Sequence, residues 1–226
     1  MKLSATCRKW LNSLPPAQGY LKKEQKTGRE FLFVRGMPSS KDEAWRLCNF
    51  KRLNNFLSLP VVIDALDYTS QIESIFPEKD QNRERIVLNP NKNPIKDINL
   101  PKGIEKLNDK EIEENLGKIV KSSNIKNDIS VSLNQASSSK LLALKIKKNI
   151  NKSLEIVIPS IENKSISTRV FLLIEKGAKF DLLQVFLGNR NSAQNHLIEI
   201  KLESDVDFHH GLISMGEEKD SSSICT

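Results

Sequence analysis

Cysteine is scarce in this sequence, and long apolar runs are missing altogether. The three cysteines, Cys7, Cys48 and Cys225, are far apart and odd in number, which does not suit a disulfide framework and indicates a reducing compartment. The apolar runs are only a few residues long, whereas a transmembrane helix needs about 20 apolar residues, and the N-terminal residues lack the apolar core of a secretory signal. We therefore expect a protein of the cytoplasm, or of the plastid stroma in a eukaryote, with no membrane partner.

Catalytic and nucleotide-binding motifs are also missing. The sequence has no G-x-x-x-x-G-K-[ST] loop for the phosphates of ATP, and no Ser/His/Asp, Cys/His or paired-carboxylate arrangement can be placed in it. Three histidines, His196, His209 and His210, and Cys225 are residue types that bind transition metals. Neighbours on a strand point to opposite faces, so His209 and His210 cannot readily share one ion. We predict a structural role for His210, a mobile position for Cys225, and no catalytic, cofactor-binding or metal-binding residue.

Positive charge is concentrated in the first part of the chain. Residues 1–60 hold 12 Lys and Arg against 4 Asp and Glu, a balance of +8, whereas residues 61–226 hold 23 against 24, a balance of −1. A basic region attracts nucleic acid or an anionic partner surface. Aromatic residues interleaved with the basic residues are sparse here, as is glycine, and no RNA-recognition or helix-turn-helix signature is present. The pattern favours a solvated basic face or a protein-contact surface, and makes nucleic acid an unlikely partner.

A repeat of 28 residues organises the second half of the sequence. Aliphatic residues coincide at this spacing in two columns, Ile146, Ile174 and Leu202, then Leu154 and Leu182, with His210 in the third copy of the second column. The apolar runs are short, rich in Val, Ile, Leu and Phe, and without helical spacing, which favours strands.

One repeat is too small to fold alone. Eight buried aliphatic side chains at roughly 1.5–3 kcal/mol each fall short of an ordering cost of roughly 1.5 kcal/mol per residue. Stacked copies are therefore required, and we predict a strand solenoid with rungs of 28 residues. An antiparallel sandwich, with the polar breaks as hairpin turns, is the alternative.

The N-terminal part reads as helical, and we divide the chain at 1–76, 77–127 and 128–226. The first helix carries an apolar face and ends at Pro15. We interpret residues 17–38 as a polar connection with a short docking segment at Phe31, Phe33 and Val34. A capping box from Ser40 to Glu43 predicts a short helix. The apolar residues of these two predicted helices are Leu3, Cys7, Trp10, Leu11 and Leu14 in the first and Ala44, Trp45 and Leu47 in the second.

The segment before the repeat combines polar stretches with short elements. We predict an amphipathic helix over residues 61–76, and residues 77–127 read as a polar linker. Within this linker, residues 85–88 are expected to form a short strand, and Asn108 to cap a helix with Ile112, Leu116 and Ile119 on one side. From Asp128 onward the pattern predicts strands.

Several ordered motifs resemble one family. GMPSSKDEAWRLCNFKRL at 36–53 resembles the Gly-x-Pro…Glu-x-Trp-Arg signature of the SufB/SufD family of iron–sulfur cluster assembly proteins, with SufD as the nearer branch. Further matches follow in the family's order. They are RIVLNPNKNPIKDINLPKGIE at 85–105, VSLNQA at 131–136, RVFLLIEKGAKFDLLQVFLG at 169–188, and residues 195–216. The resemblance covers essentially the whole chain.

The resemblance implies a mainly β fold with an α-helical N-terminal region, the start of a right-handed parallel β-helix. It also implies a non-catalytic scaffold subunit that acts with a SufB-like paralogue and a SufC-like ABC-type ATPase, on which an iron–sulfur cluster is assembled transiently. The sequence departs from the family at Leu47 and Cys48, which replace an aromatic and a hydroxyl residue. Family members are also longer, so Thr226 is expected to lie in mid-solenoid. A β-helix carbohydrate-active enzyme and a nucleic-acid-binding protein are the alternatives.

Overall fold

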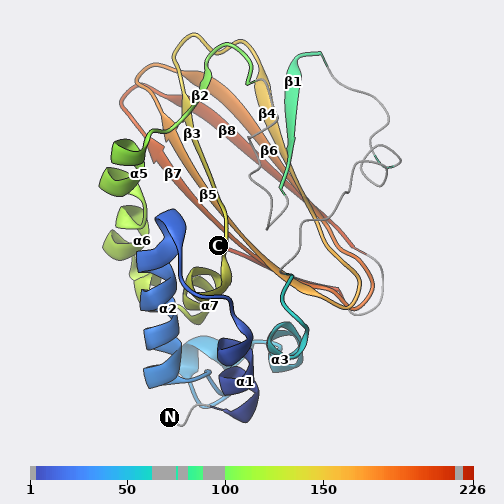
Figure 1. Cartoon of the computed structure of the whole chain (residues 1–226). Helices are drawn as coiled ribbons and strands as arrows, with labels where there is room; N and C mark the ends of the chain where they lie inside the picture. Colours follow the sequence, from blue (N-terminus) through green and yellow to red (C-terminus); the bar gives the residue numbers. More distant parts are fainter. Residues whose placement is uncertain (1–3, 63–74, 76–80, 89–99, 217–220) are drawn as a thin grey trace.

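Two layers of strands stand beside and above a group of helices in the computed structural model, which describes residues 4–62, 75, 81–88, 100–216 and 221–226 (Figure 1). The helices are α1 (Ala5–Ser13), α2 (Lys22–Arg35), α3 (Phe50–Ser58), α5 (Asp109–Asn115), α6 (Lys118–Ser122) and α7 (Ile129–Ser137). The strands are β1 (Arg83–Val87), β2 (Ile104–Lys106), β3 (Leu141–Ile146), β4 (Ser153–Pro159), β5 (Ser165–Ile174), β6 (Lys179–Leu187), β7 (Ala193–Leu202), β8 (Asp207–Met215) and β9 (Ser222–Cys225).

The strands form two sheets, and from β3 to β8 the chain alternates between them. One sheet has the order β1-β4-β6-β8 and the other β2-β3-β5-β7-β9. Every pair is parallel except β2 with β3. Ile146 pairs with Ile174 and Ile174 with Leu202, an offset of 28 residues at each step. The parallel register confirms the repeat alignment, and it excludes the antiparallel sandwich for these strands.

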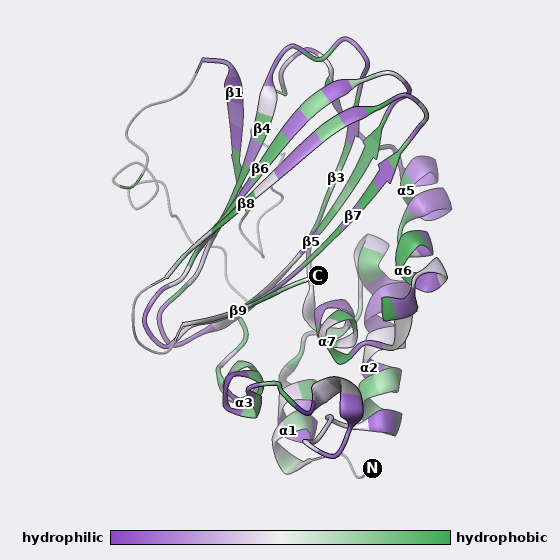
Figure 2. Cartoon of the chain, turned by 180° about the vertical axis from the view of Figure 1, so that it is seen from behind, coloured by the Kyte–Doolittle hydropathy of each residue, from purple (hydrophilic) through white to green (hydrophobic). Residues whose placement is uncertain are grey.

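The main apolar core lies between the two sheets, because each strand turns alternate side chains toward the other sheet. Figure 2 shows hydrophilic and hydrophobic residues alternating along β6 and β8. Leu154 and Leu182 are buried in this core, and the ring of Phe180 stacks on that of Phe208 at 6.1 Å. The polar break between β5 and β6 turns at Gly177, whose φ of +69° suits glycine.

Two predicted non-helical segments are helices, and both predictions were wrong for the same reason. Residues 129–137, predicted as strand, form α7, and residues 22–35 of the predicted polar connection form α2. Asp128 caps α7 by accepting a hydrogen bond from the backbone N–H of Ser130, and every residue of α7 except Ser130 is buried. The buried face of α2 holds Glu24, Gln25 and Gly28 beside Leu32, so it lacks an apolar stripe. Tertiary burial overrode the local pattern in both.

The segment after α2 also differs from the prediction. The capping box at Ser40 is not formed: a single 3-10 turn covers Glu43–Trp45, and the Asp42 carboxylate accepts a bond from the Ser39 N–H. The helix begins later, at α3, where the side chain of Asn49 caps it. Phe33, Val34 and Leu47, predicted as docking or core residues, are exposed, whereas Phe31 is half-buried.

Other local predictions are confirmed. Ser4 caps α1, whose Trp10 packs on Phe56 of α3 at 5.7 Å between ring centroids. Asn108 and Glu111 form the predicted capping box at the start of α5. Gly117 then turns the chain at a φ of +74°, so the predicted helix is divided into α5 and α6. The short strand expected at 85–88 is β1. Leu3 and most of the helix predicted at 61–76 lie outside the described residues.

None of the helices in the described ranges combines the length and the apolar character that crossing a membrane requires.

Candidate functional site

A buried polar layer, which we call the polar seam, joins α7 to the outer face of β5 and β7. It comprises Asn134, Ser137, Ser138, Ser167 and Asn195. The Nδ2 of Asn134 donates to the carbonyl oxygens of Thr168, at 2.9 Å, and Asn195, at 3.0 Å. Asn195 donates in return to the carbonyl oxygen of Ser130 at 3.0 Å. These bonds fix α7 on the sheet, since buried amide groups are costly unless paired.

An ion pair buried beside the seam attaches α6 to the sheet. Arg169 of β5 and Glu199 of β7 meet at 2.6 Å, and each side chain is 1% exposed. Glu199 also accepts hydrogen bonds from the backbone N–H groups of Gly117 and Val120. Its carboxylate is therefore occupied by structural partners, and the pair has no access to solvent or substrate.

His196 lies on the opposite, inner face of β7 and links the two sheets. Its ring stacks on Phe186 of β6 at 4.6 Å. Nε2 contacts Oε1 of Gln194 at 2.9 Å and Nδ1 contacts the hydroxyl of Thr168 at 2.7 Å. The amide nitrogen of Gln194 donates to the carbonyl of Leu187, so its oxygen is the acceptor and Nε2 of His196 carries the proton.

This environment keeps His196 uncharged. Burial lowers its pKa from 6.5 to about 3, because a charged imidazolium loses its hydration there. Both ring nitrogens are already hydrogen-bonded to protein groups. His196 is therefore a structural histidine with no free lone pair for a metal.

The adjacent histidines of β8 point to opposite faces. His209 is on the outer face, 77% exposed, with Nδ1 2.9 Å from Oδ1 of Asp181. His210 occupies the inner column above Leu182, contacts Gln184 at 2.9 Å and stacks on Phe208. Partial burial lowers the pKa of His210. The two rings therefore do not converge on a ligand.

The cysteines are also separated from one another. Cys7 lies on the buried face of α1, and this burial raises its pKa to about 11. Cys48 is exposed, and Cys225 lies in β9, paired in register with β7, rather than in the mobile position predicted. Burial raises the pKa of Cys225. Across the ranges that the structure describes, no three His, Cys, Asp or Glu side chains are grouped so that they could hold a metal ion.

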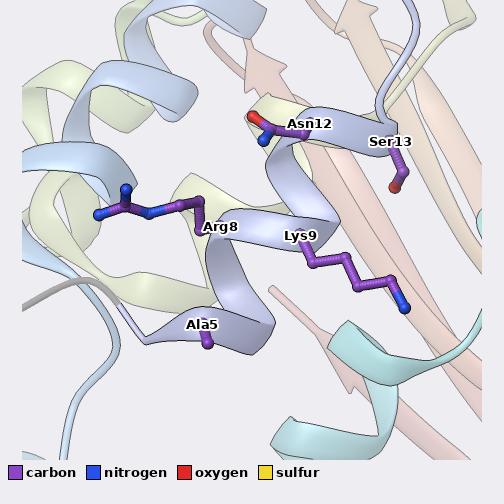
Figure 3. Close-up of a pocket in the computed structure, with 5 residues that line it drawn as sticks. All are labelled: Ala5, Arg8, Lys9, Asn12 and Ser13. Atoms are coloured by element: carbon purple, nitrogen blue, oxygen red, sulfur yellow. The ribbon is translucent and has the colours of Figure 1, made fainter.

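The surface of α1 bears a shallow depression with basic residues. It is lined by Ala5, Arg8, Lys9, Asn12 and Ser13, all from one helix face. Figure 3 shows Arg8 and Lys9 extending in opposite directions from the helix. A small-molecule site needs polar groups that converge in a concave cavity, and this depression has neither property.

Sequence reasoning missed the polar seam and the buried ion pair. A signal for the pair was present, because Glu199 stands between Ile198 and Ile200, Arg169 directly precedes the apolar run 170–174, and buried charges require a partner. No sequence pattern indicated the seam, because Asn134 and Asn195 are 61 residues apart.

Comparisons with protein-family models, with curated proteins and with solved structures gave no match to this chain.

Proposed function

We propose that the chain is a SufD-like, non-catalytic scaffold subunit of the SUF iron–sulfur cluster assembly system. It would act with a SufB-like paralogue and a SufC-like ABC-type ATPase, and the cluster would be the cargo of the complex. One observation carries the proposal: parallel strands paired at 28-residue offsets follow an α-helical N-terminal region. In this proposal the strands are the first rungs of a right-handed parallel β-helix.

Several residues that carry the family resemblance support a scaffold role, because they have structural roles in the fold. Gly36 ends α2 at a φ of +70°. Asn134 binds two strand carbonyls, Arg169 forms the buried ion pair, and Gly177 makes the turn between β5 and β6. Motifs explained by folding alone do not call for a reaction.

The polar groups of the chain also support a scaffold rather than an enzyme. His196 and Glu199, which are enclosed, are hydrogen-bonded to other protein groups. The accessible pair, Asp181 with His209, is exposed to solvent on an open strand face. A catalytic pair works best where water is excluded.

Deletion of the gene tests the proposal in the organism that encodes it. We expect the activity of iron–sulfur enzymes to fall, while enzymes without a cluster keep theirs, and the intact chain to restore the loss. Unchanged iron–sulfur enzyme activity in the deletion strain would refute the proposed function.

Matched variants separate a scaffold from an enzyme in the same strain. His209→Gln with Asp181→Asn removes the accessible acid–base pair, and Cys48→Ser with Cys225→Ser removes the two thiols outside the buried core. A non-catalytic scaffold predicts that both double variants restore activity as well as the intact chain does. Loss of rescue by a variant that is folded and normally abundant would assign chemistry to these residues.

A further inference from the structure

The helix α2 has one face packed in the fold and one face that no other element of the described residues covers. Its inner face packs on α7 through Gln25 and Gly28. The residues of its outward face recur at spacings of three and four, and they are exposed along the whole helix. We call it the α2 outward face; it comprises Lys22, Lys23, Lys26, Thr27, Glu30, Phe33 and Val34.

The exposed positive charge of this face, and of the whole helical region, is not matched by ion pairs with described residues. From residue 4 to residue 62, ten Lys and Arg are exposed but only two carboxylates, Glu30 and Glu43. None of the ten makes an ion pair with a described residue, whereas some lysines in or next to the strands, such as Lys145 and Lys147, do. The ten are Arg8, Lys9, Lys22, Lys23, Lys26, Arg35, Lys41, Arg46, Lys51 and Arg52.

The lysines of α2 stand where a helix least favours them. Lys22, Lys23 and Lys26 lie in its first two turns, near the partial positive charge of the helix dipole, which prefers acidic residues there. The acid of that turn, Glu24, is buried on the other side of the helix against Lys121 and Gln135. A local arrangement that opposes stability, such as the two exposed lysines in the first turn of α2, is typical of a functional surface.

Apolar side chains occupy the other end of the same face. Phe33 is 64% exposed and Val34 78% exposed, so neither contributes to the core. At 1.5 Å per residue, the distance along the helix from Lys22 to Val34 is about 18 Å. The face thus presents cations at one end and an exposed aromatic residue at the other, and aromatic residues are enriched at protein interfaces.

We propose that the α2 outward face binds an acidic, amphipathic segment of a partner protein. Carboxylates of that segment would lie against Lys22, Lys23 and Lys26, and an apolar side chain would cover Phe33 and Val34. A nucleic acid backbone fits the face less well, because phosphates make no use of exposed Phe33 and Val34 beyond the reach of the lysines. This inference concerns the helical region alone and does not depend on the proposed role in iron–sulfur assembly.

Fluorescence anisotropy with two labelled synthetic peptides tests the inference on the full chain. One peptide is amphipathic, with a Glu-rich half and a half that carries Leu and Phe on one helical face; the other is poly-glutamate of equal length. At about 50 mM salt, where charge interactions are only partly screened, we expect the amphipathic peptide to bind about tenfold more tightly, because only it buries apolar surface.

Paired variants test the contributions of the charged half and the apolar half of the face to binding separately. Lys22→Glu with Lys26→Glu is expected to weaken both peptides at least about tenfold, as close charge reversal does. Phe33→Ser with Val34→Ser should remove the preference for the amphipathic peptide and leave poly-glutamate binding unchanged. Lys148→Glu with Lys164→Glu, two exposed lysines at strand turns, makes the same change in net charge and should leave both affinities within about twofold.

Three outcomes would overturn the inference. The first is no binding of the amphipathic peptide at low salt. The second is an equal loss in the strand-turn control. The third is tighter binding of a random-sequence DNA duplex that competes for the same lysines, which would mark a nucleic-acid surface. Misfolding does not confuse the test, because all the substituted side chains of α2 are exposed, and the melting temperature of each variant checks that it is folded.

Discussion

At the scale of single residues, His196 and Arg169 show how polar side chains hold the strand layers together. His196 connects Thr168 and Gln194 on one sheet with Phe186 on the other, and all three of these contacts are uncharged. Arg169 depends on Glu199 for its charge partner. The role of each residue can be tested through the free energy of unfolding of its variants.

Stability should depend on pH through His196. Its pKa is about 3 in the folded chain and 6.5 when unfolded, so the folded state binds fewer protons between these values. His196 therefore does not lower the free energy of unfolding above pH 6.5. As the pH decreases from 6.5 toward 3, this residue lowers the free energy of unfolding by at most about 1.4 kcal/mol per pH unit. Urea titrations at pH 7.5, 6 and 5 should show that His196→Gln is less stable at pH 7.5 but has a flatter pH dependence. An unchanged slope would mean that His196 is not buried uncharged.

Removal of one partner from the buried ion pair should be costly. Arg169→Met leaves the Glu199 carboxylate buried without its cation, and we expect a loss of about 3–5 kcal/mol in the free energy of unfolding. Adding Glu199→Gln to this variant should restore part of the loss, which a double-mutant cycle from urea denaturation measures. Strictly additive losses would show that the two side chains do not interact.

At the scale of elements, the contact of α2 with α7 depends on the absence of a side chain at Gly28. A Cβ built at this position would lie 2.7 Å from the backbone nitrogen of Ala136 and from the carbonyl oxygen of Ser132. The two helix backbones therefore approach closely, and the side-chain amide of Gln25, one turn earlier, donates to the carbonyl of Ser138.

Gly28→Ala tests this contact against helix propensity. Alanine favours a helix by about 1 kcal/mol over glycine, but the clash with backbone should destabilise the chain by about 1–3 kcal/mol net. The neighbouring exposed position provides the control: Thr27→Ala should change the free energy of unfolding by less than about 0.5 kcal/mol. A stabilised Gly28→Ala variant in chemical denaturation would contradict the packing of α2 on α7.

The sequence predicted the elements whose stability is local or repeated. The strands and their register followed from aliphatic columns such as Ile146, Ile174 and Leu202, and α5 followed from the capping box at Asn108. The helices α2 and α7 could not be predicted in this way, because their buried faces are stabilised by partners distant in sequence: Gln135 of α7 binds Glu24 of α2, 111 residues away. Sites made of such contacts have no local pattern to detect.

At the scale of the whole molecule, charge and order are distributed unevenly. The helical region carries an excess of exposed cations that make no ion pair with a described residue, and the strand layers carry the main apolar core and several ion pairs, such as that of Lys147 with Glu175. This division suits a subunit whose strands provide a rigid support and whose helices offer a surface to partners. The same division is consistent with the proposed scaffold role.

Reconstitution of the complex is the most direct measurement of that role. Size-exclusion chromatography with light scattering would follow the purified chain mixed with the SufB-like and SufC-like proteins of the same organism. The scaffold account predicts one species whose mass equals the sum of the associated subunits and contains this chain. Elution of the chain at its own mass, while the other two proteins associate without it, would contradict the account.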